Sequence, residues 1–180
     1  MSTSIIVNGL SFRPYIGAGE IQARIQTMGR QISLDYEGKR PLFLAVLNGA
    51  FMFTADLMRA CTIDCEIAFI RLASYDGLSS SGQVKTVIGL EENLKGRHVI
   101  IIEDIVDSGK TLSAFLPQLR EKEPASVAVA ALLVKPEALE YEVPIHYKGF
   151  EIPSEFVIGY GLDYDGLGRQ LPEIYQLDEG

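Results

Sequence analysis

The strongest constraint on the fold of this chain is a set of long apolar runs. They read PLFLAVL (41–47), HVIIIED (98–104) and SVAVAALLVK (126–135). A strand that is buried on both faces has no polar side, so such runs are typical of the inner strands of a parallel sheet. Helical patterns accompany them at residues 18–35, 51–60 and 110–121. Strands that alternate with helices predict an α/β fold, with a central, largely parallel sheet flanked by helices.

Shorter patterns complete the expected organisation of the chain. Residues 66–72, 85–90 and 155–164 are each apolar enough to form a strand. Serine and glycine are frequent at 73–84, which predicts a flexible loop. We find no internal repeat and no low-complexity linker, and 180 residues are a usual length for one domain. The sequence therefore predicts a single domain over residues 1–180.

Composition and charge exclude several classes of function. The net charge is -8 and the pI is about 4.8, and no stretch is rich in lysine and arginine, so we expect no nucleic-acid partner. No apolar run is long enough to span a membrane, and the start, MSTSIIVNGL, lacks the features of a signal peptide. Cys61 and Cys65 form neither a CxxC motif nor a zinc site. We expect a cytoplasmic protein with two reduced thiols and no membrane partner.

Carboxylates at the end of a predicted strand carry the first functional signal. In IIIEDIVDSGKT (100–111), Glu103 and Asp104 directly follow three isoleucines. Asn48, Gly49, Lys135 and Asp163 also fall at, or just after, the ends of expected strands. Because ligands of parallel sheets bind at the carboxyl ends of strands, these side chains are expected to share one site. The two carboxylates would suit the vicinal hydroxyls of a sugar, directly or through a divalent metal.

The residues that follow have the composition of a phosphate site. They are Asp107, Ser108, Gly109, Lys110 and Thr111, and they lie between a strand end and a helix start. Glycine lets successive backbone N–H groups point inward, and the helix N-terminus adds partial positive charge. Hydroxyl groups add donors. This loop is therefore predicted to hold one phosphate monoester.

Two other interpretations of the stretch are weaker. Its GKT ending suggests a P-loop, but the first glycine of that motif would fall at Asp104, whose carboxylate would repel phosphates. A helix N-cap would explain Asp107 or Ser108. It would not explain why Glu103 and Asp104 end a buried strand.

The same stretch resembles the phosphoribosyl-pyrophosphate binding motif of type I phosphoribosyltransferases. Further segments are similar to those of hypoxanthine-guanine phosphoribosyltransferases: VLNGAFMFTADL (46–57), FIRLASY (69–75), ALLVKP (131–136) and FEIPSEFVIGYGLDYDGLGR (150–169). The resemblance implies the type I fold, with a small hood built from the N-terminal and C-terminal segments. It also implies purine salvage, in which Mg²⁺-dependent transfer of 5-phosphoribose to hypoxanthine or guanine gives IMP or GMP and pyrophosphate.

The resemblance implies a role for each matching residue. Phosphate and ribose would be bound by Glu103, Asp104, Asp107, Ser108, Gly109, Lys110 and Thr111. Pyrophosphate would be bound by Leu47, Asn48, Gly49 and Arg169, where the family often has a cis peptide in the loop. The purine would be bound by Lys135, Phe156, Val157 and Asp163. The metal would be held by Glu103, Asp104 and Asp163, and the closing loop would have Ser74 and Tyr75 at its tip.

Some of these roles are chemically specific. Asp107 would act as the catalytic base, or hydrogen-bond acceptor, toward N7 of the purine. Lys135 would donate to O6, and Phe156 would stack on the ring. An ammonium group only donates, so Lys135 favours 6-oxopurines over adenine. Asn48 stands where mammalian members carry a lysine, which leaves the strength of pyrophosphate binding open.

Other functions of the same fold remain open at this stage. The acceptor could be another base such as xanthine, or the chain could be a regulator that binds phosphoribosyl pyrophosphate without catalysis. Such regulators often lose the catalytic acid or add a DNA-binding segment, and this chain keeps Asp107 and has no basic extension. By the same resemblance we expect a homodimer or homotetramer.

Overall fold

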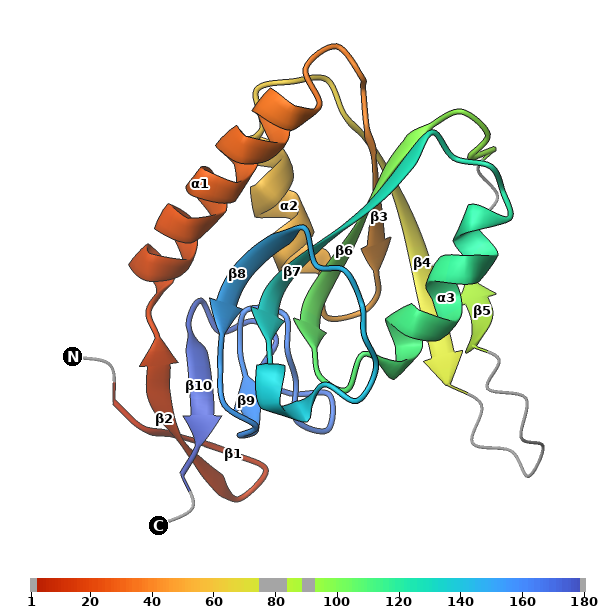
Figure 1. The fold of residues 1–180 in the computed structure, drawn as a ribbon. Coiled ribbons are helices and arrows are strands. Elements are labelled where there is room, and N and C mark those ends of the chain that lie inside the picture. Colours follow the sequence, from red (N-terminus) through yellow and green to blue (C-terminus); the bar gives the residue numbers. More distant parts are fainter. Residues whose placement is uncertain (1–2, 75–83, 89–92, 179–180) are drawn as a thin grey trace, which may run out of the picture.

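A six-stranded sheet forms the centre of the molecule (Figure 1). The computed structural model describes residues 3–74, 84–88 and 93–178. The strand order is β5-β4-β3-β6-β7-β8, with bounds β3 (Leu42–Val46), β4 (Glu66–Ser74), β5 (Val84–Ile88), β6 (His98–Val106), β7 (Ser126–Val134) and β8 (Tyr147–Glu151). All neighbours in this order pair in parallel except β5, which pairs antiparallel with β4. The predicted α/β fold with a largely parallel sheet is confirmed.

Helices cover both faces of this sheet. They are α1 (Ala18–Asp35), α2 (Phe51–Ala60) and α3 (Lys110–Arg120). α1 and α2 lie on one face and α3 lies on the other (Figure 1). Ile100 and Ile102 of β6 pack in the core under α1 and α2, whereas Ile101 packs in the core under α3. The strand is buried from both sides, which explains its apolar run.

The two ends of the chain form a second sheet, which has four antiparallel strands. In spatial order they are β1 (Ile5–Val7), β2 (Leu10–Ile16), β10 (Ile174–Leu177) and β9 (Val157–Ile158). In Figure 1 this sheet lies below the arrow tips of β7 and β8, so it borders the carboxyl ends of the main strands. A short 3-10 helix, η1 (Pro136–Ala138), follows β7. No helix in the described part of the chain is long and apolar enough to cross a membrane.

The strand predicted over residues 155–164 is wrong in extent, because the strand in this range covers only Val157–Ile158. Gly159, Tyr160 and Gly161 follow with φ of 98°, 49° and 101°, a left-handed region that strands do not adopt. The chain turns back there, since the N–H groups of Gly159 and Leu162 each donate to the other's carbonyl at 3.0 Å. The sequence analysis also missed β1, which has only three residues, and β2, β8 and β10, which mix apolar with polar residues.

The helices α1 and α2 are in close contact at Gly29 of α1. A Cβ at Gly29 would lie 2.5 Å from Cβ of Ala60 and 2.7 Å from its carbonyl oxygen. Gly19 lies on the same helix, and a Cβ there would have no atom within 4 Å. Replacing each of these two glycines by alanine therefore separates the effect of crowding from the effect of helix propensity.

We predict that Gly29→Ala lowers the free energy of unfolding by about 1 to 3 kcal/mol, the usual cost of overpacking. Gly19→Ala should leave it unchanged or raise it by up to about 1 kcal/mol, because alanine favours helix and meets no neighbour. Urea denaturation of both variants measures the difference. Equal effects of the two substitutions would contradict the packing explanation.

Candidate active site

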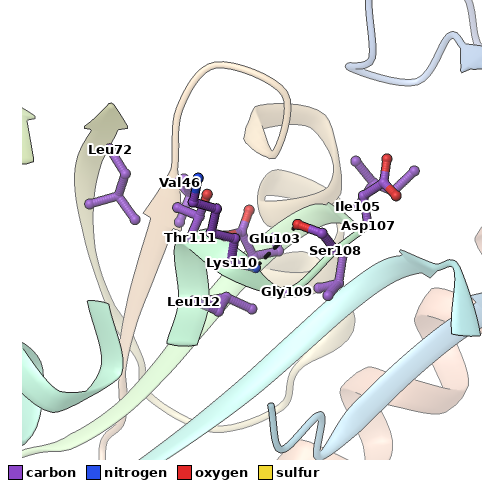
Figure 2. Close-up of a pocket in the computed structure, with 11 residues that line it drawn as sticks. Val46, Leu72, Glu103, Ile105, Asp107, Ser108, Gly109, Lys110, Thr111 and Leu112 are labelled. Atoms are coloured by element: carbon purple, nitrogen blue, oxygen red, sulfur yellow. Dashed lines mark hydrogen bonds between the residues drawn. The ribbon is translucent and has the colours of Figure 1, made fainter. Parts of the chain in front are cut away.

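The connection between β6 and α3 surrounds a cavity of about 260 Å³. Its lining includes Glu103 of β6 and every residue of 107–111 (Figure 2). Figure 2 shows Asp107 at one side of the cavity, beyond Ser108. The structure therefore brings one acid of the strand together with the whole predicted phosphate loop, and it adds an apolar wall of Val46 and Leu72 that the sequence did not reveal.

Gly109 lets this loop turn directly into α3. Its φ is 80°, and a Cβ there would lie 2.9 Å from the carbonyl oxygen of Tyr141. The carbonyl of Ser108 accepts hydrogen bonds from the N–H groups of Glu140 (3.0 Å) and Tyr141 (3.1 Å). The segment after η1 thus fixes the loop from outside. Because α3 begins at Lys110, the partial positive charge of its N-terminus lies at the cavity.

Two adjacent carboxylates at the end of β6 are held away from water. Burial raises the pKa of Glu103 well above its usual range, and the charge of Asp104 raises it further. Burial also raises the pKa of Asp104, although the N–H of Ile105, which donates at 2.7 Å, opposes this shift. Among the described residues, none forms a hydrogen bond or ion pair with the carboxylate of Glu103. Such a group is stabilised in its charged form only by a cation or by hydroxyl donors.

The loop after β3 packs directly on these acids. A Cβ at Gly49 would lie 1.6 Å from Oδ2 of Asp104, so any side chain at this position would force the carboxylate of Asp104 to move. A Cβ at Gly161 would in turn lie 2.1 Å from the carbonyl oxygen of Gly49. The peptide between Leu47 and Asn48 is cis. Three segments that are distant in the sequence therefore meet here: Gly49 packs on the side chain of Asp104, and Gly161 packs on the backbone of Gly49.

Lys135 reaches the same edge from the end of β7. Its side chain is 9% exposed, and its Nζ lies 3.5 Å from Oδ2 of Asp107. The backbone N–H of Lys135 donates to the carbonyl of Val106 at 3.0 Å, which keeps the ends of β6 and β7 together. A buried ammonium group beside a largely exposed carboxylate provides a donor and an acceptor at one place.

Phe156 forms an aromatic platform nearby on the second sheet. It is 42% exposed and is supported by Tyr164, whose ring meets it edge-on with centroids 5.7 Å apart, and by the buried ring of Phe12 at 6.3 Å. Val157 is buried and pairs with Gln176 of β10. The sequence analysis missed Phe12 and Tyr164, since nothing in their local pattern marks them as neighbours of Phe156.

Asp163 and Arg169 form an ion pair beside this platform. Their closest atoms are 2.8 Å apart, and the other oxygen of Asp163 accepts from the N–H of Gly166 at 2.7 Å. Arg169 also donates to the carbonyl of Gly161 at 2.7 Å. Asp163 is close enough to influence the pKa of Asp104. However, no cluster of three or more possible metal ligands is found in the described ranges.

The predicted closing loop cannot be placed in this site. Tyr75 and most of residues 73–84 lie outside the described residues, and Ser74 is known only as the last residue of β4. The two cysteines are unpaired, as expected. Burial raises the pKa of the Cys61 thiol to about 11, which makes this thiol unreactive at neutral pH.

Comparisons with known proteins agree with this geometry. The sequence model of the phosphoribosyl transferase domain matches residues 17–165. The hypoxanthine phosphoribosyltransferase of Salmonella typhimurium is 43% identical, over 91% of this chain and 96% of that protein. The hypoxanthine-guanine phosphoribosyltransferase of Mycobacterium tuberculosis is 42% identical, over 98% of this chain and 95% of that protein.

Solved structures have the same fold. The Staphylococcus aureus hypoxanthine phosphoribosyltransferase superimposes with a TM-score of 0.88 at 34% identity, over 92% of this chain and 91% of that one. A Trypanosoma cruzi hypoxanthine phosphoribosyl transferase, studied for the role of its C-terminal region in oligomeric state and enzymatic activity, gives 0.88 at 36% identity, over 97% and 95%. The chain belongs to the phosphoribosyl transferase family and, within it, to the hypoxanthine and hypoxanthine-guanine phosphoribosyltransferases.

Proposed function

We propose that this enzyme transfers 5-phosphoribose from phosphoribosyl pyrophosphate to N9 of hypoxanthine or guanine in purine salvage. The bond from C1 of the ribose to pyrophosphate breaks, a C1–N9 bond forms, and the purine loses one proton, giving IMP or GMP and pyrophosphate. The observation that carries the proposal is the buried Lys135, 3.5 Å from Asp107 at the side of the phosphate cavity. The names of the relatives support the same substrates.

The base would lie between Lys135 and Phe156. Lys135 donates to the 6-oxo group, and its ammonium could not pair with the 6-amino group of adenine. Asp107 accepts a hydrogen bond or a proton from N7, which favours loss of the purine proton as the C1–N9 bond forms. Phe156 offers a partly exposed ring for stacking, and the backbone of Val157 offers donors and acceptors to the base edge.

The substrate phosphoribosyl pyrophosphate would extend along the edge of the main sheet. Residues 107–111 hold the 5-phosphate through backbone N–H groups, hydroxyls and the N-terminus of α3. Glu103 and Asp104 accept hydrogen bonds from the ribose hydroxyls. The Leu47–Gly49 loop and Arg169 bind the pyrophosphate. Arg169 would then share its charge between Asp163 and the departing group.

The residues present fit Mg²⁺ as a cofactor. Glu103 and Asp104 are adjacent oxygen donors, and within the described ranges Arg169 is the one cation that lowers the pKa of Asp104. Mg²⁺ is usually held by one or two carboxylates together with waters and substrate phosphates, so a three-carboxylate cage is not required. Asp163 would complete the set directly or through water. When bound, the ion would offset charge on the leaving pyrophosphate.

Four further features of the proposal rest on family resemblance. The loop at 73–84, with Ser74 and Tyr75 at its tip, closes over the reactants and keeps water from the ribose cation. The chain forms one domain over residues 1–180, with the small sheet as its hood. It acts in the cytoplasm. It assembles as a homodimer or homotetramer, which the study of oligomeric state in the Trypanosoma cruzi relative supports.

We predict that a Mg²⁺-dependent assay with phosphoribosyl pyrophosphate shows turnover of hypoxanthine and guanine but not adenine. Nucleotide formation is followed separately for hypoxanthine, guanine, xanthine and adenine. A strong preference for xanthine would mean that the enzyme is a phosphoribosyltransferase of the same family that uses a different base. Binding of the donor without turnover of any base would favour a regulator and contradict the proposal.

Lys135→Gln should lower kcat/KM for hypoxanthine by about 10- to 100-fold, because one hydrogen bond from a buried charge is lost. The matched control is Lys95→Gln, which also breaks a lysine–carboxylate pair, but one that is exposed and formed with Glu123. This control should retain full activity. A Lys135→Gln enzyme with wild-type kcat/KM would remove Lys135 from the base site.

Glu103→Gln should stabilise the ligand-free enzyme at neutral pH by at least about 1 kcal/mol, while it lowers turnover. Burial raises the pKa of Glu103, so the folded chain holds this proton more tightly than the unfolded chain does. The charge therefore costs stability only above the usual pKa of 4.5, and the gain should disappear below it. Urea denaturation of the wild type and the variant, at neutral pH and at a pH below 4.5, measures this difference in stability. The control is Glu121→Gln, at an exposed site, which should have little effect on stability at either pH. A Glu103→Gln variant that is less stable than the wild type at neutral pH would refute the argument.

A further inference from the structure

Tyr160 combines an unusual backbone with a polar anchor in the core. It has φ of 49°, which is uncommon for a residue with a large side chain, and it is only 4% exposed. Its hydroxyl donates to Oδ2 of Asp56 on α2. Burial raises the pKa of Tyr160, and the nearby carboxylate of Asp56 raises it further, so the hydroxyl stays protonated and keeps donating. A left-handed conformation at such a residue persists only where the surroundings hold it.

Asp56 is itself held by two other side chains. Oδ2 accepts from Nε2 of Gln22 on α1 at 2.9 Å, and Oδ1 lies 3.3 Å from the guanidinium of Arg59. The acceptor of the tyrosine bond is therefore fixed by both helices of one layer. Because α2 begins at Phe51, directly after the loop at 47–49, Asp56 belongs to the element that anchors this loop.

The chain on either side of Tyr160 reaches the active site. Gly161 packs so closely on the carbonyl of Gly49 that a Cβ would lie 2.1 Å from this oxygen. Gly161 and Arg169 are tied in both directions: the N–H of Gly161 donates to the carbonyl of Arg169 at 3.0 Å, and Arg169 donates back to the carbonyl of Gly161 at 2.7 Å. Any movement of Gly161 would thus move Arg169 and its partner Asp163 relative to Gly49.

We infer that the hydrogen bond from Tyr160 to Asp56 positions the 159–169 segment against the Leu47–Gly49 loop and thereby sets the affinity for the pyrophosphate group. Tyr160 and Asp56 are positioning residues, since neither lines the cavity. The inference rests on the proposed function, because it concerns the residues assigned to pyrophosphate. The base site should be affected less. Tyr164 of this segment meets Phe156 edge-on, but Val157 and Ile158 precede the turn and are held by pairing with β10.

Tyr160→Phe removes only the hydroxyl and tests this role. We expect KM for phosphoribosyl pyrophosphate, and for pyrophosphate in the reverse reaction, to rise about ten-fold, which corresponds to about 1.4 kcal/mol. KM for hypoxanthine should rise by a clearly smaller factor. Asp56→Asn keeps the shape of the acceptor but removes its charge, so it should raise the same two constants by a smaller factor.

Tyr147→Phe is the matched control. Tyr147 also donates to a carboxylate, that of Asp35 at 2.7 Å, but this bond joins the start of β8 to the end of α1. Its loss should lower stability to a similar extent and leave both KM values unchanged. If the role of Tyr160 were purely structural, Tyr160→Phe would likewise lower stability and leave both KM values unchanged.

Two results would overturn the inference: unchanged KM for phosphoribosyl pyrophosphate in folded Tyr160→Phe enzyme, or an equal rise in both KM values. Calorimetric titration of phosphoribosyl pyrophosphate into the wild type and the variants distinguishes a failure of this inference from a failure of the proposed function. If the wild type turned over no purine but bound the donor, the proposed function would fail. A weaker donor affinity in Tyr160→Phe would still support the positioning role, and an equal affinity would refute it.

Discussion

The architecture of the site depends on one close contact, that of the Asp104 carboxylate with the backbone of Gly49. A Cβ at Gly49 would lie 1.6 Å from Oδ2 of Asp104, so the loop after β3 has no side chain where it meets the end of β6. This contact brings a phosphate-type loop, a pair of acids and the 159–169 segment to one sheet edge. Parallel pairing of β3 with β6 makes the contact possible, because it aligns the carboxyl ends of both strands.

The buried acids at the end of β6 leave the free enzyme with unfavourable electrostatic energy that bound ligands would relieve. Burial raises the pKa of both Glu103 and Asp104, which means that ionised carboxylates are unfavourable there without a partner. Hydroxyl groups of a ribose, and a cation that bridges to phosphate, would supply what is missing. On the proposed function, an enzyme with a net charge of -8 would thus bind a polyanionic donor through local groups. The overall charge says little about such a site.

The parts of the fold that the sequence predicted are those fixed by local pattern. The runs at β3, β6 and β7 and the periodicity of α1 reflect burial on known faces, and the residue types of 107–111 reflect the chemistry of a phosphate loop. Resemblance to a family pointed to Lys135 and Phe156. The structure adds what depends on long-range contacts: the ring of Phe12 behind Phe156, the turn at Gly159–Gly161 that ends β9, and the bond from Tyr160 to Asp56. Each joins residues over 100 positions apart or depends on a left-handed backbone, and no local pattern encodes either.

A crystal structure of the enzyme with bound IMP would test the central claim most directly. The account predicts the phosphate within hydrogen-bond distance of the backbone N–H groups of residues 108–111 and the ribose hydroxyls beside Glu103 and Asp104. It also predicts O6 of the base next to Nζ of Lys135, with the ring on Phe156. A nucleotide bound at another edge of the sheet, or with its base away from Lys135, would contradict the assignment of this cavity as the active site.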